Sequence, residues 1–319
     1  MRIAVVTITK DEAPFIPRWA DSASEADELV IGDTGSVDET VELASDLGIT
    51  VHELAVRPWR FDIARTSLLT LVPADVDWII TLDADEVLVP GWRAYIEKTA
   101  AEHPEARRLG YDYVWSWVEG KEGIEPDVRF NADRCHGRWG WRWVGPVHEV
   151  LADSDGEGNT NAVWAGFGIE HYADNSKPRS SYLPLLQLAV AEEPTNPRQR
   201  MYLSREYFFA GHWDEARQGF MQYLRMPEAT WTAERADAYR YLARMDDYPE
   251  RWLLKAIAED PGRRDAVVDL VDLLVGQERW VEAAGMAQRA LSTRQRPGDY
   301  MTTAHAYDDD HLREIMSRA

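Results

Sequence analysis

The sequence predicts an α/β domain followed by an all-α domain, and three observations lead to this prediction. Short apolar runs rich in Val and Ile alternate with helical stretches up to about residue 177. From residue 178 onward the pattern is helical almost throughout, and four prolines recur there at intervals of 33, 34 and 36 residues. A chain of 319 residues has room for two domains. We therefore divide it at Lys177-Pro178 into domains 1–177 and 178–319.

The first domain is expected to hold a parallel sheet. Its strands are expected at residues 3–8, 28–32, 50–55 and 78–82. Helices are expected between them, at residues 15–26, 37–47 and 63–71. Strands that alternate with helices are typical of parallel α/β sheets. We expect Ser36 and Glu39 to form a capping box for the second helix, and Gly48 to end it.

Acidic residues follow three of these strands. They are Asp11-Glu12, Asp33 and the run Asp83-Ala84-Asp85-Glu86. Ligands of parallel sheets bind beyond the carboxyl ends of the strands. Two carboxylates there can hold a divalent cation, and the cation can hold a diphosphate. A short Asp-x-Asp string is also common in solvated loops, but its place after a buried strand favours a site.

The second domain shows a repeat of about 34 residues. Its prolines are Pro194, Pro227, Pro261 and Pro297. The segment 211–216 is echoed by 277–283, with Trp213 and Trp280 at equivalent places. This period is that of tetratricopeptide repeats, in which pairs of helices stack. A small Ala after each turn lets two helices approach, and each Pro cannot continue the second helix. An irregular helical bundle with chance proline spacing is the alternative.

Composition narrows the classes of function. The net charge is −21, which argues against a surface that binds nucleic acid through its phosphates. Cys135 is the single cysteine, so no internal disulfide can form. The sequence has no apolar run long enough to span a membrane, and its first residues are too briefly apolar for a signal peptide. We therefore expect a cytoplasmic protein.

The order of these motifs resembles family 2 glycosyltransferases, whose nucleotide-diphospho-sugar transferase fold is called GT-A. The resemblance covers about the first 90 residues. Its motifs are Val5–Glu12, Glu28–Thr40, Ala64-Arg65 and Asp83–Glu86. Further motifs, Val128-Arg129-Phe130 and Gly145–Glu149, resemble a bacterial subgroup that joins GT-A to tetratricopeptide-like helices, as in the peptide S-glycosyltransferases.

The resemblance implies a role for each matching residue in binding the donor. Thr7 and Glu12 would lie near the nucleoside, Asp33 would meet the base, and Arg65 would pack near the base and phosphates. Asp83 would face the ribose and metal, with Ala84 beside it. Asp85 would bind Mn²⁺ or Mg²⁺ directly, joined by His171. The family usually reads Arg-Asn where this chain has Arg65-Thr66. Simpler roles are a turn for Asp33, a solvated cation for Arg65 and a structural side chain for His171.

A base is needed beside the acceptor if the sugar is transferred with inversion. Glu149 is the candidate, because Gly145-Pro146 before it can form a sharp turn that aims it into the cleft. Asp127 and Asp133 are the alternatives. His148 and Glu149 could instead only order a loop.

Tryptophans follow the last strands of the first domain. Trp139, Trp141 and Trp143 alternate and would share one face if extended, as would Trp115 and Trp117. With His148 they are candidates to contact the sugar or acceptor, and core packing is the alternative for them. Arg134, Arg138 and Arg142 are spaced along the same segment and could form a local basic patch.

The function implied is that of a metal-dependent, inverting glycosyltransferase. It would move a sugar from a nucleotide sugar, a UDP-sugar, to a side chain of a protein or peptide. One alternative is a glycosyltransferase whose acceptor is a nucleic-acid base or a small glycan. Another is an adaptor protein whose GT-A domain is catalytically dead. The helices would supply an acceptor groove, although their apolar faces would also permit a homodimer.

Overall fold

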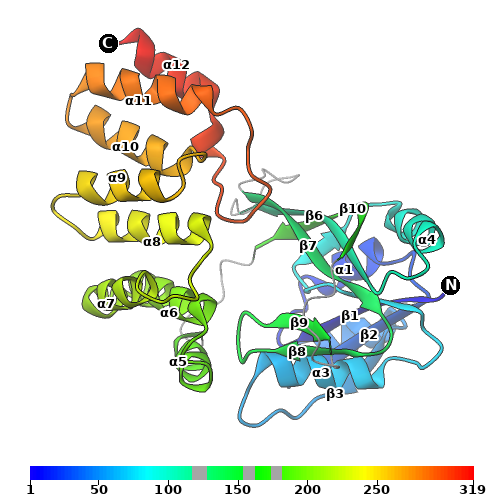
Figure 1. Cartoon of the computed structure of the whole chain (residues 1–319). Helices are drawn as coiled ribbons and strands as arrows, with labels where there is room; N and C mark the ends of the chain where they lie inside the picture. The colour runs from blue at the N-terminus through cyan, green and yellow to red at the C-terminus, as the bar shows by residue number, and fades with distance from the viewer. Residues whose placement is uncertain (117–127, 154–161, 174–181) are drawn as a thin grey trace. The chain divides into compact units, whose positions relative to one another are not determined.

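The computed structural model describes residues 1–116, 128–153, 162–173 and 182–319. The chain divides into two compact units, Met1–Lys177 and Pro178–Ala319 (Figure 1). Asp127 and Trp117, both named above, lie outside the described residues. Within the described parts of both units, none of the helices has the length and apolar character needed to cross a bilayer.

The first unit is a mixed sheet with helices. Its elements are β1 (Ile3–Thr9), α1 (Ile16–Ser22), β2 (Glu28–Asp33), α2 (Thr40–Asp46), β3 (Thr50–Glu53), α3 (Phe61–Leu71), β4 (Trp78–Thr81), β5 (Glu86–Leu88), α4 (Trp92–Glu102), β6 (Arg108–Ser116), β7 (Val128–Gly137), β8 (Trp141–Val144), β9 (Val150–Asp153) and β10 (Val163–Tyr172). The described strands form an eight-stranded sheet of order β3-β2-β1-β4-β7-β6-β10-β5 and a separate pair, β8-β9.

The expected parallel sheet forms one half of the large sheet. Strands β3, β2, β1 and β4 pair in parallel, as predicted. Strand β7 then runs antiparallel to both β4 and β6, which makes the complete sheet mixed. The α/β class is therefore confirmed, and the antiparallel extension was not predicted.

Alternate residues of β1 enter two cores on opposite faces of the sheet. Ile3 and Val5 belong to one core, and Ala4 and Val6 to the other. Side chains along a strand point alternately to its two faces. A strand covered on both faces is therefore apolar without a break, which explains why this run was readable from the sequence.

One predicted helix start is wrong. The helix expected at 37–47 begins at Thr40, and Ser36 does not cap it. The Ser36 hydroxyl instead donates to Asp33 and accepts from the backbone N–H of Asp11. The side chain of Asp38, two residues before the helix begins, accepts a hydrogen bond from the Thr40 amide at 3.0 Å. The helix expected at 15–26 is also shorter, Ile16–Ser22.

The second unit is helical in its described part. Its elements are α5 (Tyr182–Glu192), α6 (Pro197–Phe209), α7 (Trp213–Tyr223), α8 (Thr232–Arg244), α9 (Glu250–Glu259), α10 (Asp265–Gly276), α11 (Trp280–Ser292), a 3₁₀ turn η2 (His305–Tyr307) and α12 (Asp309–Ser317). Consecutive helices pack in pairs, α6 with α7, α8 with α9 and α10 with α11 (Figure 1).

The helical pairs recur with the predicted spacing. Helices α6, α8 and α10 begin at Pro197, Thr232 and Asp265, which are 35 and 33 residues apart. Each of the four recurring prolines follows the end of α5, α7, α9 or α11. Ala216 and Ala283 are fully buried near the starts of α7 and α11. The small side chains and the prolines therefore lie where the sequence analysis expected them.

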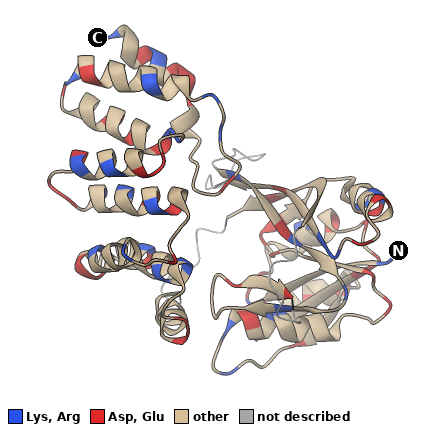
Figure 2. Ribbon diagram, viewed as in Figure 1, with Lys and Arg blue, Asp and Glu red and all other residues tan. Residues whose placement is uncertain are grey.

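Acidic and basic residues are interspersed on these helices (Figure 2). Ion pairs join neighbouring helices, such as that of Arg279, the residue before α11, with Glu250 of α9 at 2.7 Å. Arg240 of α8 similarly contacts Asp269 of α10 at 2.6 Å. The charges of the second unit thus serve in part to join its helices.

Candidate active site

The site lies at the edge of the sheet where β1, β2 and β4 end. These strands are parallel, so their carboxyl ends meet at one edge. Thr9 at the end of β1 lies beside Asp33 at the end of β2. Asp83 follows directly after Leu82, whose amide donates to the Val6 carbonyl at 3.0 Å. The acidic clusters therefore follow adjacent strands, as expected.

Asp83 is held between two arginines. Arg65 of α3 donates from Nη2 to Oδ1 at 2.6 Å, and Arg134 of β7 donates from Nη1 to Oδ2 at 3.0 Å. Burial would raise the pKa of Asp83, but the charges of Arg65 and Arg134 hold it well below its usual range. Asp83 is therefore a carboxylate whose two oxygens are both engaged.

Arg65 connects Asp83 to Glu149. Its Nε donates to Glu149 Oε1 at 2.5 Å, and its guanidinium carbon lies 5.3 Å from the centre of the Trp143 ring. Arg65 is only 8% exposed, so the alternative of a solvated cation is wrong. Burial opposes its charge, yet Asp83 and Glu149 together raise the pKa of Arg65.

The loop that carries Glu149 is tied to the start of α3. Gly145 has a φ of +105°, which favours glycine, and its amide donates to Asp62 Oδ2 at 3.0 Å. The Pro146 carbonyl accepts from the Phe61 amide at 3.1 Å. The sharp turn predicted at Gly145-Pro146 is thus present. Its hydrogen bonds to α3 explain why Glu149 meets Arg65.

The alternative base Asp133 belongs to a different group. Its carboxylate pairs with Arg108 at 2.9 Å. Its neighbour on β7, Arg134, instead contacts Asp83. The carboxylate of Asp133 is therefore engaged by Arg108, apart from the Asp83–Arg65–Glu149 network.

Asp85 and His171 form a second pair at the same edge. Asp85 Oδ2 lies 2.9 Å from His171 Nε2, and the Tyr172 amide donates to the Asp85 carbonyl at 2.9 Å. Burial lowers the pKa of His171, but its hydrogen bond to Asp85 and nearby carboxylates raise it overall. Trp115 stacks on the imidazole, with ring centres 5.4 Å apart. His171 is thus placed beside Asp85, as the sequence analysis expected.

The Asp85–His171 pair fits a divalent cation. Adjacent ligands of an octahedral ion with bonds of ~2.1 Å lie about 3.0 Å apart. The oxygen and nitrogen are separated by 2.9 Å. A carboxylate is a preferred ligand of Mn²⁺ and Mg²⁺, and imidazole is a common metal ligand in proteins.

Glu86, Tyr113 and Arg134 were missed as site residues. Glu86 is 1% exposed, accepts from Arg134 and from the Tyr113 hydroxyl, and also accepts from the Asp83 amide at 2.8 Å. Burial and Glu86 raise the pKa of Tyr113 well above its usual value. Glu86 belongs to the acidic segment Asp83–Glu86 after β4. Nothing in the sequence indicates that this segment contacts Arg134 of β7, which lies about 50 residues later in the chain.

The local basic patch that the sequence left open does not form from Arg134 and Arg138. Arg134 binds Asp83 and Glu86, whereas Arg138 donates to the carbonyls of Val72 and Pro73. Their side chains therefore serve separate internal contacts.

Asp33 acts as the organiser of a turn. One of its oxygens accepts from the amides of Gly35 and Ser36, both at 3.0 Å. The other accepts from the hydroxyls of Ser36 and Thr9. Asp33 thus has the role in a turn that the sequence analysis gave as the alternative to binding the base.

The other predicted donor residues differ in position. Thr7 is fully buried within β1 and its hydroxyl donates to the Ile8 carbonyl at 3.2 Å, so it is not brought to the site edge. The Glu12 amide donates to Thr40 Oγ1 at 2.8 Å in the loop after β1. Ala84 is 5% exposed between the two aspartates.

The three alternating tryptophans do not share a face. Strand β8 begins at Trp141, so Trp139 lies outside it, 64% exposed and beneath the Arg138 guanidinium at 4.0 Å. Trp141 and Trp143 are buried in the core beside α3. Core packing, the alternative, therefore holds for these two. His148 has a φ of +49° in the turn before Glu149.

Thr66 stands at the position where the family 2 glycosyltransferases that this sequence resembles usually have asparagine. Its hydroxyl accepts from the Trp143 amide at 2.9 Å. This contact joins α3 to β8, so the departure serves to hold Arg65 against Trp143.

Comparison with known proteins finds a family model that is similar to part of the first unit. Residues 4–121 match the family model described as Glycosyl transferase family 2. The match lies within the first unit, and the predicted GT-A-like α/β domain followed by a helical region is confirmed.

Two relatives match different lengths of the chain. An uncharacterized glycosyltransferase of Rickettsia felis is 35% identical over 111 residues, 34% of this chain and 38% of the relative. A TPR repeat-containing protein of Synechococcus elongatus is 28% identical over 165 residues, 48% of this chain and 36% of the relative. The chain therefore spans well under half the length of these relatives.

Solved structures align more loosely. Residues 1–349 of Staphylococcus aureus TarS align over 78% of this chain and 90% of that chain, with 12% identity and a TM-score of 0.41. Glucosyl-3-phosphoglycerate synthase of Mycobacterium tuberculosis, solved with Mn²⁺ and uridine diphosphate, aligns over 36% of this chain and 44% of that chain, with 22% identity and a TM-score of 0.30.

Proposed function

We propose that the chain is a metal-dependent, inverting glycosyltransferase that uses a UDP-sugar. The observation that carries the proposal is the pairing of Asp85 with His171 beside the Asp83–Arg65–Glu149 network at one sheet edge. The match of residues 4–121 to the glycosyl transferase family 2 model supports it.

Asp85 and His171 are the residues that would hold the cation, Mn²⁺ or Mg²⁺. Asp83 is less suited to direct ligation, because Arg65 and Arg134 engage both of its oxygens. A cation bound there would supply positive charge that neutralises the departing diphosphate. Asp83 is then a positioning residue that faces the nucleotide while the two arginines fix its orientation.

Glu149 is the proposed base. Its Oε1 is held by Arg65, which orients the carboxylate and leaves Oε2 for the acceptor. The acceptor oxygen or sulfur forms a bond to the sugar C1 as the bond from C1 to the diphosphate breaks. The acceptor proton passes to Glu149, so charge and atoms balance.

The acceptor is proposed to be a protein or peptide side chain. We take the two compact units as the domains 1–177 and 178–319, and the helical pairs as tetratricopeptide-like repeats. Their spacing of 35 and 33 residues supports this reading, as does the likeness to a TPR repeat-containing protein. Stacked pairs of this kind form extended concave surfaces that suit peptides.

Hydrolysis of UDP-glucose and related UDP-sugars, with and without Mn²⁺, tests the activity. A glycosyltransferase should release UDP slowly in the presence of Mn²⁺, and Asp85→Asn should abolish that release. Equal UDP release by the wild type and this variant would contradict the proposed site. A dead adaptor would release no UDP from any sugar nucleotide.

A further inference from the structure

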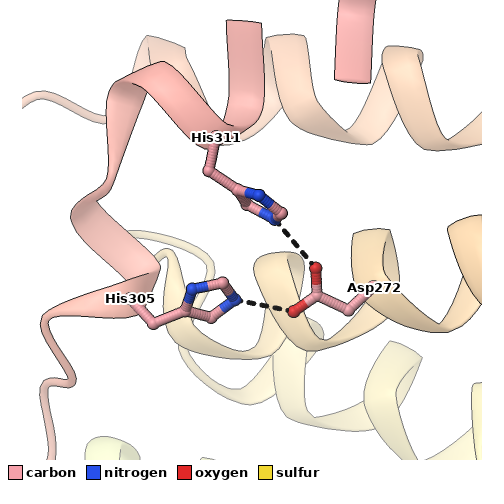
Figure 3. Close-up of side chains that lie close together, drawn as sticks. All are labelled: Asp272, His305 and His311. Carbon is pink, nitrogen blue, oxygen red and sulfur yellow. Dashed lines mark hydrogen bonds and ion pairs between the residues drawn. The ribbon is translucent and has the colours of Figure 1, made fainter. Parts of the chain in front are cut away.

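Two histidines and an aspartate converge in the second unit, and none of them belongs to the groups described above. Asp272 lies on α10, His305 in η2 and His311 in the first turn of α12 (Figure 3). One ligand atom from each lies within 4.8 Å of the others. All three belong to one compact unit, so the cluster is complete within it.

Both imidazoles present the same nitrogen to one carboxylate. His305 Nε2 lies 2.8 Å from Asp272 Oδ2, and His311 Nε2 lies 3.0 Å from Oδ1. The two rings are 4.9 Å apart between centres. As Figure 3 shows, both rings therefore point their Nε2 edges at the same carboxylate.

Neighbouring contacts hold the three residues in place before any ligand binds. The Thr303 amide, two residues before His305, donates to Asp265 Oδ1 of α10 at 2.9 Å. Asp308 caps α12 by accepting from the His311 amide at 3.1 Å. Leu312, the residue after His311, is fully buried in the core of the second unit, so it anchors α12 there. These contacts limit the motion of both histidine backbones.

The structure assigns to Asp272, His305 and His311 a binding site for Zn²⁺. Two imidazole nitrogens and one carboxylate oxygen form a common three-residue ligand set for zinc, with water as the fourth ligand. The side chains of His305, Asp272 and His311 are 53%, 41% and 32% exposed, so water has access. This inference is independent of the proposed transfer reaction.

Binding requires small movements and no outside reactant. Ligands of a tetrahedral zinc with bonds of ~2.0–2.1 Å lie ~3.3 Å apart. The Nε2 atoms of His305 and His311 lie 2.8 and 3.0 Å from different oxygens of Asp272, and one ligand atom from each of the three residues lies within 4.8 Å of the others. Binding of zinc would bring these three atoms to ~3.3 Å from one another. To bind the ion, each imidazole would carry its N–H on Nδ1 and give the Nε2 lone pair to zinc.

The bound ion would fasten the end of the chain to α10. His305 and His311 flank the start of α12, whereas Asp272 lies on α10 some 33 and 39 residues earlier. A ligand that binds only the folded arrangement stabilises it. Zinc should therefore slow opening of residues 305–317.

The test is a zinc titration of the full chain after stripping with a chelator. A His171→Ala background removes the other metal-binding candidate, so that zinc at Asp85 does not confuse the count. We expect near one zinc per chain. His305→Ala and Asp272→Asn should each weaken binding at least ~10-fold, since each removes a ligand. His212→Ala, at the start of α7, is the matched control and should bind normally.

Hydrogen–deuterium exchange supplies a second readout. Zinc should slow exchange in residues 305–317 of the His171→Ala protein and have no effect there in its His305→Ala derivative. His305 is largely exposed, so this derivative should fold, and His311→Gln is a second variant if it does not. Zinc binding that is unchanged in His305→Ala and in His311→Gln would overturn the assignment, as would binding with no change in exchange.

Discussion

The Nε atom of Arg65 donates to Oε1 of Glu149 at 2.5 Å, across 84 positions of sequence. The same guanidinium binds Asp83 through Nη2. One buried side chain therefore links the carboxylate after β4 with the proposed base in the turn after β8.

Asp85→Asn should abolish Mn²⁺-dependent binding of UDP while the fold is retained. The amide cannot supply the negative oxygen that a divalent cation prefers. Isothermal titration with UDP, with and without Mn²⁺, measures the effect. Asp21→Asn, on the exposed side of α1, is the control. A mutant that binds UDP and Mn²⁺ as tightly as wild type would remove Asp85 from the metal site.

Glu149→Gln should lower kcat by ~10²–10⁴-fold, the range for loss of a general base. The Gln oxygen can still accept from Arg65, so the KM for the donor should change little. Steady-state kinetics with a transferable acceptor make the measurement, and Asp133→Asn should turn over normally because Asp133 pairs with Arg108. Wild-type turnover in Glu149→Gln would move the base to another residue.

Arg65→Met should destabilise the fold by about 3 kcal/mol. Breaking a buried ion pair costs ~3–5 kcal/mol. The lower end applies here because the Asp83 side chain is 34% exposed and keeps Arg134. Urea unfolding measures the change. Adding Glu149→Gln to Arg65→Met should recover part of the loss, since it removes the unpaired charge. No recovery would show that the network does not act as a unit.

His136 should make the protein less stable as the pH falls below about 6.5. Burial lowers the pKa of His136 to about 4 in the folded state. Between the two values the unfolded chain binds more protons than the folded chain, so stability is lost as the pH falls. From pH 7 to pH 5 this group should account for about 2 kcal/mol. The free energy of unfolding, measured at pH 7 and pH 5, should fall by about 2 kcal/mol less in His136→Gln than in the wild type. In His103→Gln, a substitution at an exposed site, it should fall as in the wild type.

A chain that ends at Lys177 should bind the UDP-sugar but lose transfer to a protein acceptor. The donor residues all lie in the first unit, whereas the proposed acceptor groove lies in the second. Circular dichroism establishes whether the shortened chain folds, and size-exclusion chromatography compares its oligomeric state with that of the full chain. If the full chain is a dimer and the shortened chain is a monomer that still transfers the sugar to the acceptor, the helices serve dimerisation and do not bind the acceptor.

The sequence by itself determined the class of fold and the order of its parts. The run Ile3–Val6 of β1 is apolar without a break because both faces of the sheet are covered there, so the strand could be read directly from the sequence. The prolines and small alanines marked the helical pairs because each limits what one position can adopt. Asp83, Asp85 and Arg65 were found as motifs because they follow local elements or lie within them.

The tertiary structure alone decided which of these groups meet. Arg134, Glu86 and Tyr113 come together only because β7 and β6 extend the sheet antiparallel beside β4, a pairing that no local pattern encodes. The burial of Trp141 and Trp143 depends likewise on where β8 begins and on its packing against α3. Periodicity reports on one element at a time, whereas contacts between distant segments depend on the free energy of packing the whole chain.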